Sequence, residues 1–140
     1  MNVFIDTNIL LDFLCRREGF YEEAKDLFTL GYTNKIDLSI LSLSVVNAIY
    51  IGRKYGSVAL RSNLRKVLDF MTVIDLTGSI TKKALDTEWK DYEDTVQHLS
   101  ALACYADCIV TRNKKDFSQS ALPVYTPTEF LLQFELLGVS

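Results

Sequence analysis

Short apolar runs alternate with amphipathic stretches along this chain, and that alternation limits the folds open to it. The apolar runs fall at 3–5, 36–40, 72–76, 109–110 and 123–125. Between them, apolar residues recur at the three-to-four-residue spacing of a helix. Strands that are separated by helices form parallel sheets with helices on both faces. The sequence therefore predicts an α/β fold of three layers, α/β/α, around a small parallel β-sheet.

Length and composition point to one compact domain over residues 1–140. The chain is 49% hydrophobic with a net charge of −3, and domains commonly run about 100–200 residues. No apolar run reaches the roughly 18 residues of a membrane span. The three cysteines (Cys15, Cys104 and Cys108) lack metal-ligand spacing, which fits a reducing, cytoplasmic setting. The acidic balance argues against binding of nucleic acid through bulk positive charge and leaves room for a local basic patch.

Three acids are predicted to meet at one edge of the sheet. Asp6 follows the first strand, and Asp116 lies in the loop after the fourth. Ligands of open α/β sheets bind beyond the carboxyl ends of the strands. Asp94 opens a helix predicted over 94–106 and points away from its apolar side. Clustered acids repel one another, and the usual reason for such a group is a divalent cation.

Each acid also has a purely structural interpretation. Asp6 can serve only as a helix cap. Asp94 can be a first-turn acid that the helix dipole favours, and Asp116 an ordinary loop residue. Their joint position at the strand ends favours a shared site over three unrelated roles.

Four segments of the chain are similar to those of one known family. They are VFIDTNILLDFL at the start, SLSVVNAIY in the middle, YEDTVQHLSALACYADCIVTRNKKDF near the end and the closing PVYTPTEFL. These segments resemble the PIN domain, most closely the VapC-type toxin ribonucleases. The resemblance implies an acidic pocket that binds Mg²⁺ or Mn²⁺ and endonucleolytic cleavage of RNA. It also implies a cognate antitoxin as partner and a homodimer.

Carried over by position, the resemblance places metal-binding acids at Asp6, Asp94 and Asp116. The family usually has a Glu in the helix after the second strand, where this chain has Asn47. An Asn carbonyl can ligate Mg²⁺ or hold a water, but it carries no charge and is a poor base. The catalytic set implied is therefore these three acids with Asn47. Neighbouring Glu93 either compensates for the missing carboxylate or is a solvated first-turn residue.

The chemistry implied is metal-assisted hydrolysis of a phosphodiester. A bound Mg²⁺ or Mn²⁺ lowers the pKa of its water and neutralises charge on the attacked phosphate. The loop before Asp116 supplies the predicted substrate contacts, namely Thr111, Arg112, Asn113, Lys114 and Lys115. Two further basic pairs, 16–17 and 53–54, either reach RNA phosphates or form solvated surface.

Several other side chains admit two interpretations each. Trp89 and Tyr92 either stack on an unpaired base or cover an edge of the core. His98 is expected on a helix surface or as a minor phosphate contact. A last group on the terminal helix supplies either a dimer interface or core, namely Phe130, Leu131 and Phe134.

Two other functions compete with the nuclease. The first is a PIN-like binding module that lost its Glu, holds RNA or a protein, and cuts nothing. The second is a haloacid-dehalogenase-like phosphatase, which also begins with an Asp after an apolar strand. That family requires a second Asp two residues later, and this chain has Asn8 there. The phosphatase is therefore the weaker alternative.

Overall fold

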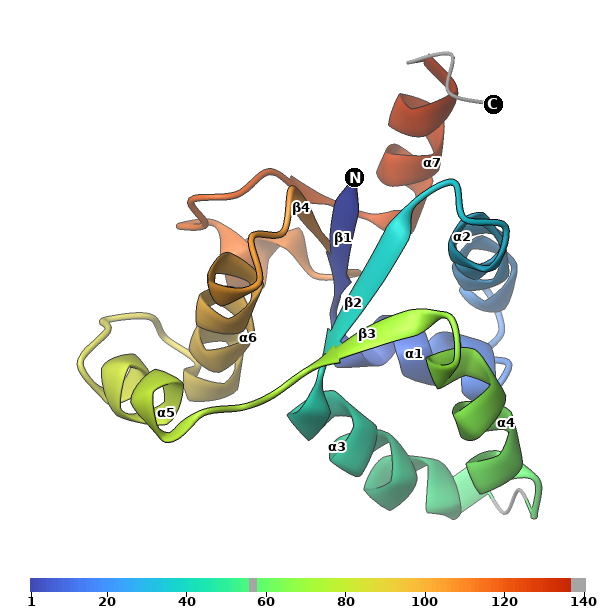
Figure 1. Ribbon diagram of the computed structural model, residues 1–140, viewed down its shortest axis with the longest axis horizontal. Helices are drawn as coiled ribbons and strands as arrows, with labels where there is room; N and C mark the ends of the chain where they lie inside the picture. The colour runs from blue at the N-terminus through green and yellow to red at the C-terminus, as the bar shows by residue number, and fades with distance from the viewer. Residues whose placement is uncertain (56–57, 137–140) are drawn as a thin grey trace.

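The central feature of the fold is a sheet of five parallel strands (Figure 1). The computed structural model describes residues 1–55 and 58–136. Within that part the strand order is β3-β2-β1-β4-β5. The strands are β1 (Asn2–Ile5), β2 (Asp37–Leu41), β3 (Met71–Ile74), β4 (Cys108–Val110) and β5 (Val124–Tyr125). All five predicted strands are confirmed, with ends that differ from the predicted ones by at most two residues.

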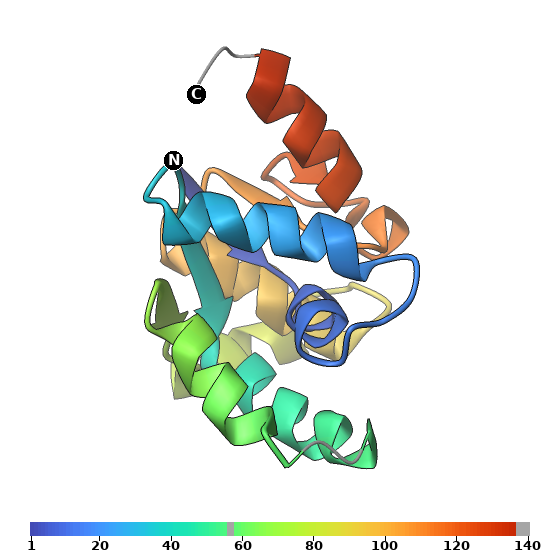
Figure 2. The same ribbon diagram turned by 90° about the vertical axis from the view of Figure 1, so that its right-hand side faces the viewer.

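Helices cover both faces of this sheet, so the predicted three-layer α/β/α class is confirmed. They are α1 (Thr7–Leu14), α2 (Tyr21–Tyr32), α3 (Ser42–Gly52), α4 (Leu60–Leu68), α5 (Gly78–Leu85), α6 (Tyr92–Ala103) and α7 (Pro127–Leu136), with short 3₁₀ turns η1 (Arg53–Tyr55) and η2 (Lys114–Phe117). Helices α5 and α6 lie on one side of the sheet, and α1, α2 and α4 lie on the other (Figure 1). Figure 2 shows the second side facing the viewer.

Residues of β1 divide between two hydrophobic cores because successive side chains point to opposite faces. Val3 and Ile5 belong to the cluster under α1, α2 and α4, whereas Phe4 packs in the cluster under α5 and α6. A strand that is buried on both faces reads as a continuous apolar run. The carboxyl ends of β1 and β2 lead directly into α1 and α3, which fixes where the loop side chains gather (Figure 1).

Helix α6 begins earlier than predicted and ends earlier too. It spans Tyr92–Ala103, and its N-cap is Asp91, whose carboxylate accepts a hydrogen bond from Asp94 N over 3.0 Å. Ser42 and Ser44 lie at the start of α3, but neither caps that helix. The N-cap there is Leu41 without a side-chain hydrogen bond, and both hydroxyls bond elsewhere, Ser42 Oγ accepting from Leu76 N over 3.1 Å. Thr77 is the N-cap of α5, and its Oγ1 accepts a hydrogen bond from Ile80 N over 3.1 Å.

The buried face of α6 is more polar than the predicted apolar side. Four polar residues of α6 are buried, namely Thr95, Gln97, His98 and Ser100. The prediction that His98 lies on the helix surface is wrong, because only 7% of it is exposed. Its Nε2 accepts a hydrogen bond from Ala121 N over 3.1 Å, and burial lowers its pKa. The ring of Trp89 stacks on His98 at 4.6 Å between centroids, so Trp89 covers an edge of the core.

The terminal helix α7 packs its aromatic residues inward. Phe130 and Phe134 are buried in the cluster on the α1 and α2 side, so the core interpretation of these two holds. Helix α7 begins with Thr126 as a cap, whose Oγ1 accepts from Glu129 N over 3.2 Å. Among residues 1–55 and 58–136, none of the helices combines the length and the apolar character that a membrane crossing needs.

Candidate active site

Asp6 occupies the junction between β1 and α1, and both of its carboxylate oxygens are held. Oδ1 accepts a hydrogen bond from Thr7 N over 2.8 Å, and Oδ2 accepts one from Thr111 Oγ1 over 2.9 Å. Burial raises the pKa of Asp6, and the hydrogen bonds from Thr111 and Thr7 oppose that rise. The carboxylate is thus fixed in place in surroundings that disfavour its charge, which a nearby cation would relieve.

Asp94 and Asp116 belong to the same electrostatic cluster as Asp6. Burial, followed by the charges of Asp91, Asp116, Asp6 and Glu93, raises the pKa of Asp94 to about 7. Asp94 and Asp116 also line one pocket of about 210 Å³ together with Trp89 and Lys115. The structure therefore brings the three acids predicted from the sequence into one region, from β1, α6 and η2.

Asn47 lies beside Glu93, the residue considered above as compensating for the carboxylate that position 47 lacks. Asn47 Nδ2 on α3 donates a hydrogen bond to Glu93 Oε1 on α6 over 3.1 Å. Burial and then the charges of Asp6 and Asp91 raise the pKa of Glu93, whereas the hydrogen bond from Asn47 lowers it. A fourth carboxylate thus interacts with Asp6, and it comes from α6 rather than α3.

The chemistry of these donors fits a hard divalent cation. Carboxylate and amide oxygens are the ligands that Mg²⁺ and Mn²⁺ prefer. In the described part of the chain, no group of three or more Asp, Glu, His or Cys side chains is arranged to hold a metal ion as it stands. Binding of an ion would therefore require these acids to change side-chain conformation toward one point.

A buried network of hydrogen bonds between hydroxyl and amide groups lies directly next to Asp6. It was not predicted from the sequence. Thr7 Oγ1 and Ser44 Oγ share a hydrogen bond of 2.6 Å. Gln97 Nε2 donates to Ser44 Oγ over 2.9 Å and to Thr7 Oγ1 over 3.4 Å. These residues join α1, α3 and α6 directly next to Asp6. No sequence signal marks them, because isolated Ser, Thr and Gln residues are most often exposed.

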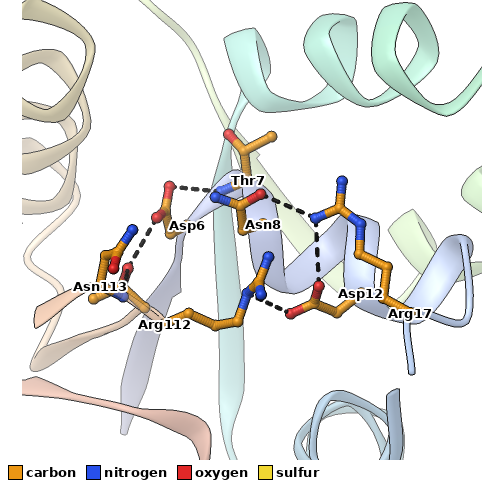
Figure 3. A network of polar contacts seen from close by, with 8 residues as sticks. Asp6, Thr7, Asn8, Asp12, Arg17, Arg112 and Asn113 are labelled. Carbon is orange, nitrogen blue, oxygen red and sulfur yellow. Dashed lines mark hydrogen bonds and ion pairs between the residues drawn. The ribbon is translucent and has the colours of Figure 1, made fainter. Parts of the chain in front are cut away.

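Arg112, predicted to contact RNA, reaches away from Asp6 toward α1 (Figure 3). Its Nε lies 3.0 Å from Asp12 Oδ2, and its guanidinium lies 3.9 Å over the ring of Phe20. Arg17 also pairs with Asp12 at 3.5 Å, and its Nη1 donates to Asn8 Oδ1 over 3.1 Å (Figure 3). Asp12 was missed by sequence reasoning, although an acid inside the apolar run ILLDFL is an available signal.

Three other predicted substrate residues lie on the surface of the same loop, whereas Thr111 is fully buried and its hydroxyl faces Asp6 rather than the solvent. Asn113, Lys114 and Lys115 are exposed. Asn113 N donates to Thr111 Oγ1 over 3.1 Å, and Lys114 Nζ pairs with Glu129 Oε2 at 3.2 Å. Lys115 lines the pocket of Asp94 and Asp116. Lys115 is thus the cation of this loop that borders the acidic pocket.

Three of the remaining basic and aromatic candidates, Arg16, Arg53 and Tyr92, have partners of their own. Arg16 and Arg53 lie over the rings of Tyr21 and Tyr50, at 5.5 and 4.2 Å from their centroids. The hydroxyl of Tyr92 donates to Thr81 O over 2.9 Å. A larger pocket of about 680 Å³ lies between α3 and α4 and is lined by none of the three clustered acids.

The family model described as the PIN domain matches residues 2–115. The chain therefore belongs to the PIN domain family, as its motifs predicted. No curated protein matches the chain.

Solved structures with the same fold include a toxin–antitoxin complex. A toxin–antitoxin complex from Klebsiella pneumoniae is 24% identical with a TM-score of 0.63, over 89% of this chain and 97% of that one. VapBC2 from Rickettsia felis, bound to a DNA fragment from its promoter, is 20% identical with a TM-score of 0.64 over 89% and 97%. PAE2754 from Pyrobaculum aerophilum is 16% identical with a TM-score of 0.63 over 97% and 90%. These likenesses support the fold.

Proposed function

We propose that this chain is a metal-dependent endoribonuclease of the PIN toxin type. The observation that carries the proposal is the cluster of Asp6, Asp94 and Asp116. Burial, followed by the charges of Asp91, Asp116, Asp6 and Glu93, raises the pKa of Asp94 in this cluster to about 7. Acids collected from three elements at the carboxyl edge of a parallel sheet are best explained by a cation that they share. We propose Mg²⁺ or Mn²⁺, held by these three acids.

The protein's own residues prepare this site for phosphodiester hydrolysis. A bound divalent ion would supply an activated water and neutralise charge on the attacked phosphate. Thr111 and the backbone of Thr7 hold the Asp6 carboxylate in one orientation. Lys115 offers a donor to the RNA backbone at the pocket, and Lys114 and Asn113 are exposed in the same loop. Asn47 acts through Glu93 in this scheme, since the two are hydrogen-bonded.

The proposed partners follow from the family and from the solved neighbours. Neighbouring structures include toxin–antitoxin complexes, which supports a cognate antitoxin as the partner that restrains this chain. We further propose a homodimer that works in the cytoplasm, with residues 1–140 as a single domain. Binding of RNA is proposed because a phosphodiester is the substrate that an acid-held metal and a basic rim suit.

Cleavage of a single-stranded RNA with and without divalent ion tests the proposal. Wild type is expected to cut in Mg²⁺ or Mn²⁺ and to stop in EDTA, and Asp6→Asn is expected to be inactive in all three. Equal inactivity of wild type and Asp6→Asn would contradict the nuclease.

One observation favours a second candidate, a PIN module that binds RNA or protein without cutting. Position 47 carries an uncharged Asn, so α3 contributes no carboxylate to the cluster. Such a module would bind RNA in EDTA and in Mn²⁺ alike and leave it intact. The cleavage assay above separates the two candidates.

A further inference from the structure

Asn47 and Glu93 form a hydrogen bond between helices that are far apart in sequence. Asn47 Nδ2 donates to Glu93 Oε1 over 3.1 Å. A first-turn Glu that served only the helix dipole would need no such partner. The hydrogen bond from Asn47 to Oε1 limits the conformations of the Glu93 side chain. It does not engage the other carboxylate oxygen, Oε2.

The carboxylate of Glu93 belongs to the acidic cluster. Glu93 adjoins Asp94 on α6, and its charge acts on Asp94. Asp6, at the end of β1, is the strongest charged influence on Glu93. Helices α3 and α6 are also joined through Ser44 and Gln97, whose hydrogen bond of 2.9 Å is buried. The two helices are therefore held together beside Asp6, with Asn47 and Glu93 as a second contact between them.

We infer that Glu93 supplies the metal-facing carboxylate that position 47 lacks, and that Asn47 is a positioning residue that holds it there. The inference rests on the proposed metal site. In this arrangement α6 supplies, through Glu93, the carboxylate that the family usually has on α3, and the carboxylate faces the same acidic cluster. The amide at position 47 then acts as a hydrogen-bond donor to a ligand, a role that neighbours of metal ligands commonly have.

A matched control for Glu93 is present in α2. Glu22 is the second residue of α2, as Glu93 is the second residue of α6, and both are first-turn acids. Both substitutions to Gln remove one charge from the same helical position. A difference between them therefore isolates the acidic cluster from the helix dipole.

Calorimetric titration of the full chain with Mn²⁺ tests the inference. Glu93→Gln is expected to weaken Mn²⁺ binding by about tenfold or more, and Asn47→Ala by about tenfold. Glu22→Gln is expected to bind as wild type. The exchange variant Asn47→Glu/Glu93→Gln returns a carboxylate to α3 and lets the new amide donate to it. It is expected to recover most of the lost affinity.

The outcomes separate this inference from the metal site itself. Wild-type affinity in Glu93→Gln, or an exchange variant no better than Glu93→Gln, would overturn the inference while Asp6-dependent binding stands. Wild type binding no more tightly than Asp6→Asn would overturn the metal site and the inference together. Thermal unfolding without metal identifies any variant that does not fold, and Asn47→Ala, which removes only the donor, then carries the test.

Discussion

The guanidinium of Arg112 and the carboxylate of Asp12 form an ion pair of 3.0 Å, and the side chain of Asp12 is only 1% exposed. The pair ties the loop after β4 to the last turn of α1 (Figure 3). Thr111, next to Arg112, donates to Asp6 Oδ2. The Asp12 pair therefore holds the segment that orients Asp6, and Arg112 has a structural use that competes with contact to RNA.

We predict that Arg112→Met lowers the free energy of unfolding by about 2–3 kcal/mol. Removal of one partner of a buried pair costs about 3–5 kcal/mol, and we reduce that figure because Arg17 also faces Asp12. Chemical denaturation measures the loss, and Lys25→Met on the exposed face of α2 is the control, expected within about 0.5 kcal/mol of wild type. An Arg112→Met variant that is as stable as wild type but binds RNA more weakly would instead show that Arg112 contacts the RNA.

Lys115 is predicted to contribute more to RNA binding than Lys114. Lys115 borders the pocket of Asp94 and Asp116, whereas Lys114 is paired with Glu129. In an Asp6→Asn background, Lys115→Ala should weaken RNA binding and reduce the salt slope by about 0.7 for one lost phosphate contact. Lys114→Ala should change the slope less. An unaltered slope for Lys115→Ala would place that lysine outside the RNA path.

The sequence predicts the order of elements well because buried parallel strands carry their own signal. β4 is a continuous apolar run and β1 is one from Val3 on, and each strand lies where its run does. The carboxyl ends of such strands meet at one edge. The pattern of apolar runs is therefore sufficient to place Asp6 and the β4 loop near each other.

Side-chain partners across helices cannot be predicted in the same way. Ser44 has the sequence context of a cap, but its hydroxyl bonds to Thr7 because α3 and α1 meet there. His98 is expected at the surface, but Trp89 and the backbone of Ala121 enclose it. Such pairings depend on how helices pack, and a helical period gives only the direction of each side chain on its own helix. The hydrogen bond between α3 and α6 at the acidic cluster is of the same kind.

Thr111→Val is predicted to weaken Mn²⁺ binding by about tenfold, and Thr111→Ser to preserve it. The hydroxyl donates to Asp6 Oδ2 over 2.9 Å from a fully buried side chain. Loss of a hydrogen bond that orients a metal ligand commonly costs about 10–100-fold in affinity. Calorimetry with Mn²⁺ measures the change. Equal affinities for the Val and Ser variants would remove the hydroxyl from the site.

The metal-free protein is predicted to lose stability as pH rises from about 4 to about 7. Burial and the neighbouring acids raise the pKa of Asp94 from 3.8 to about 7. The folded state then binds a proton that the unfolded state has released, so unfolding becomes easier as pH rises through this window. Asp94→Asn should flatten the profile and raise the melting temperature in EDTA at neutral pH. A profile equally steep in both proteins would contradict the raised pKa.

Diffraction from crystals soaked in Mn²⁺ tests the central claim most directly, because anomalous scattering locates the ion without reference to activity. We predict a manganese peak among the carboxylates of Asp6, Asp94 and Asp116 in wild-type crystals and no such peak in Asp6→Asn crystals. No wild-type peak there at saturating Mn²⁺, with the three side chains unmoved, would contradict that claim.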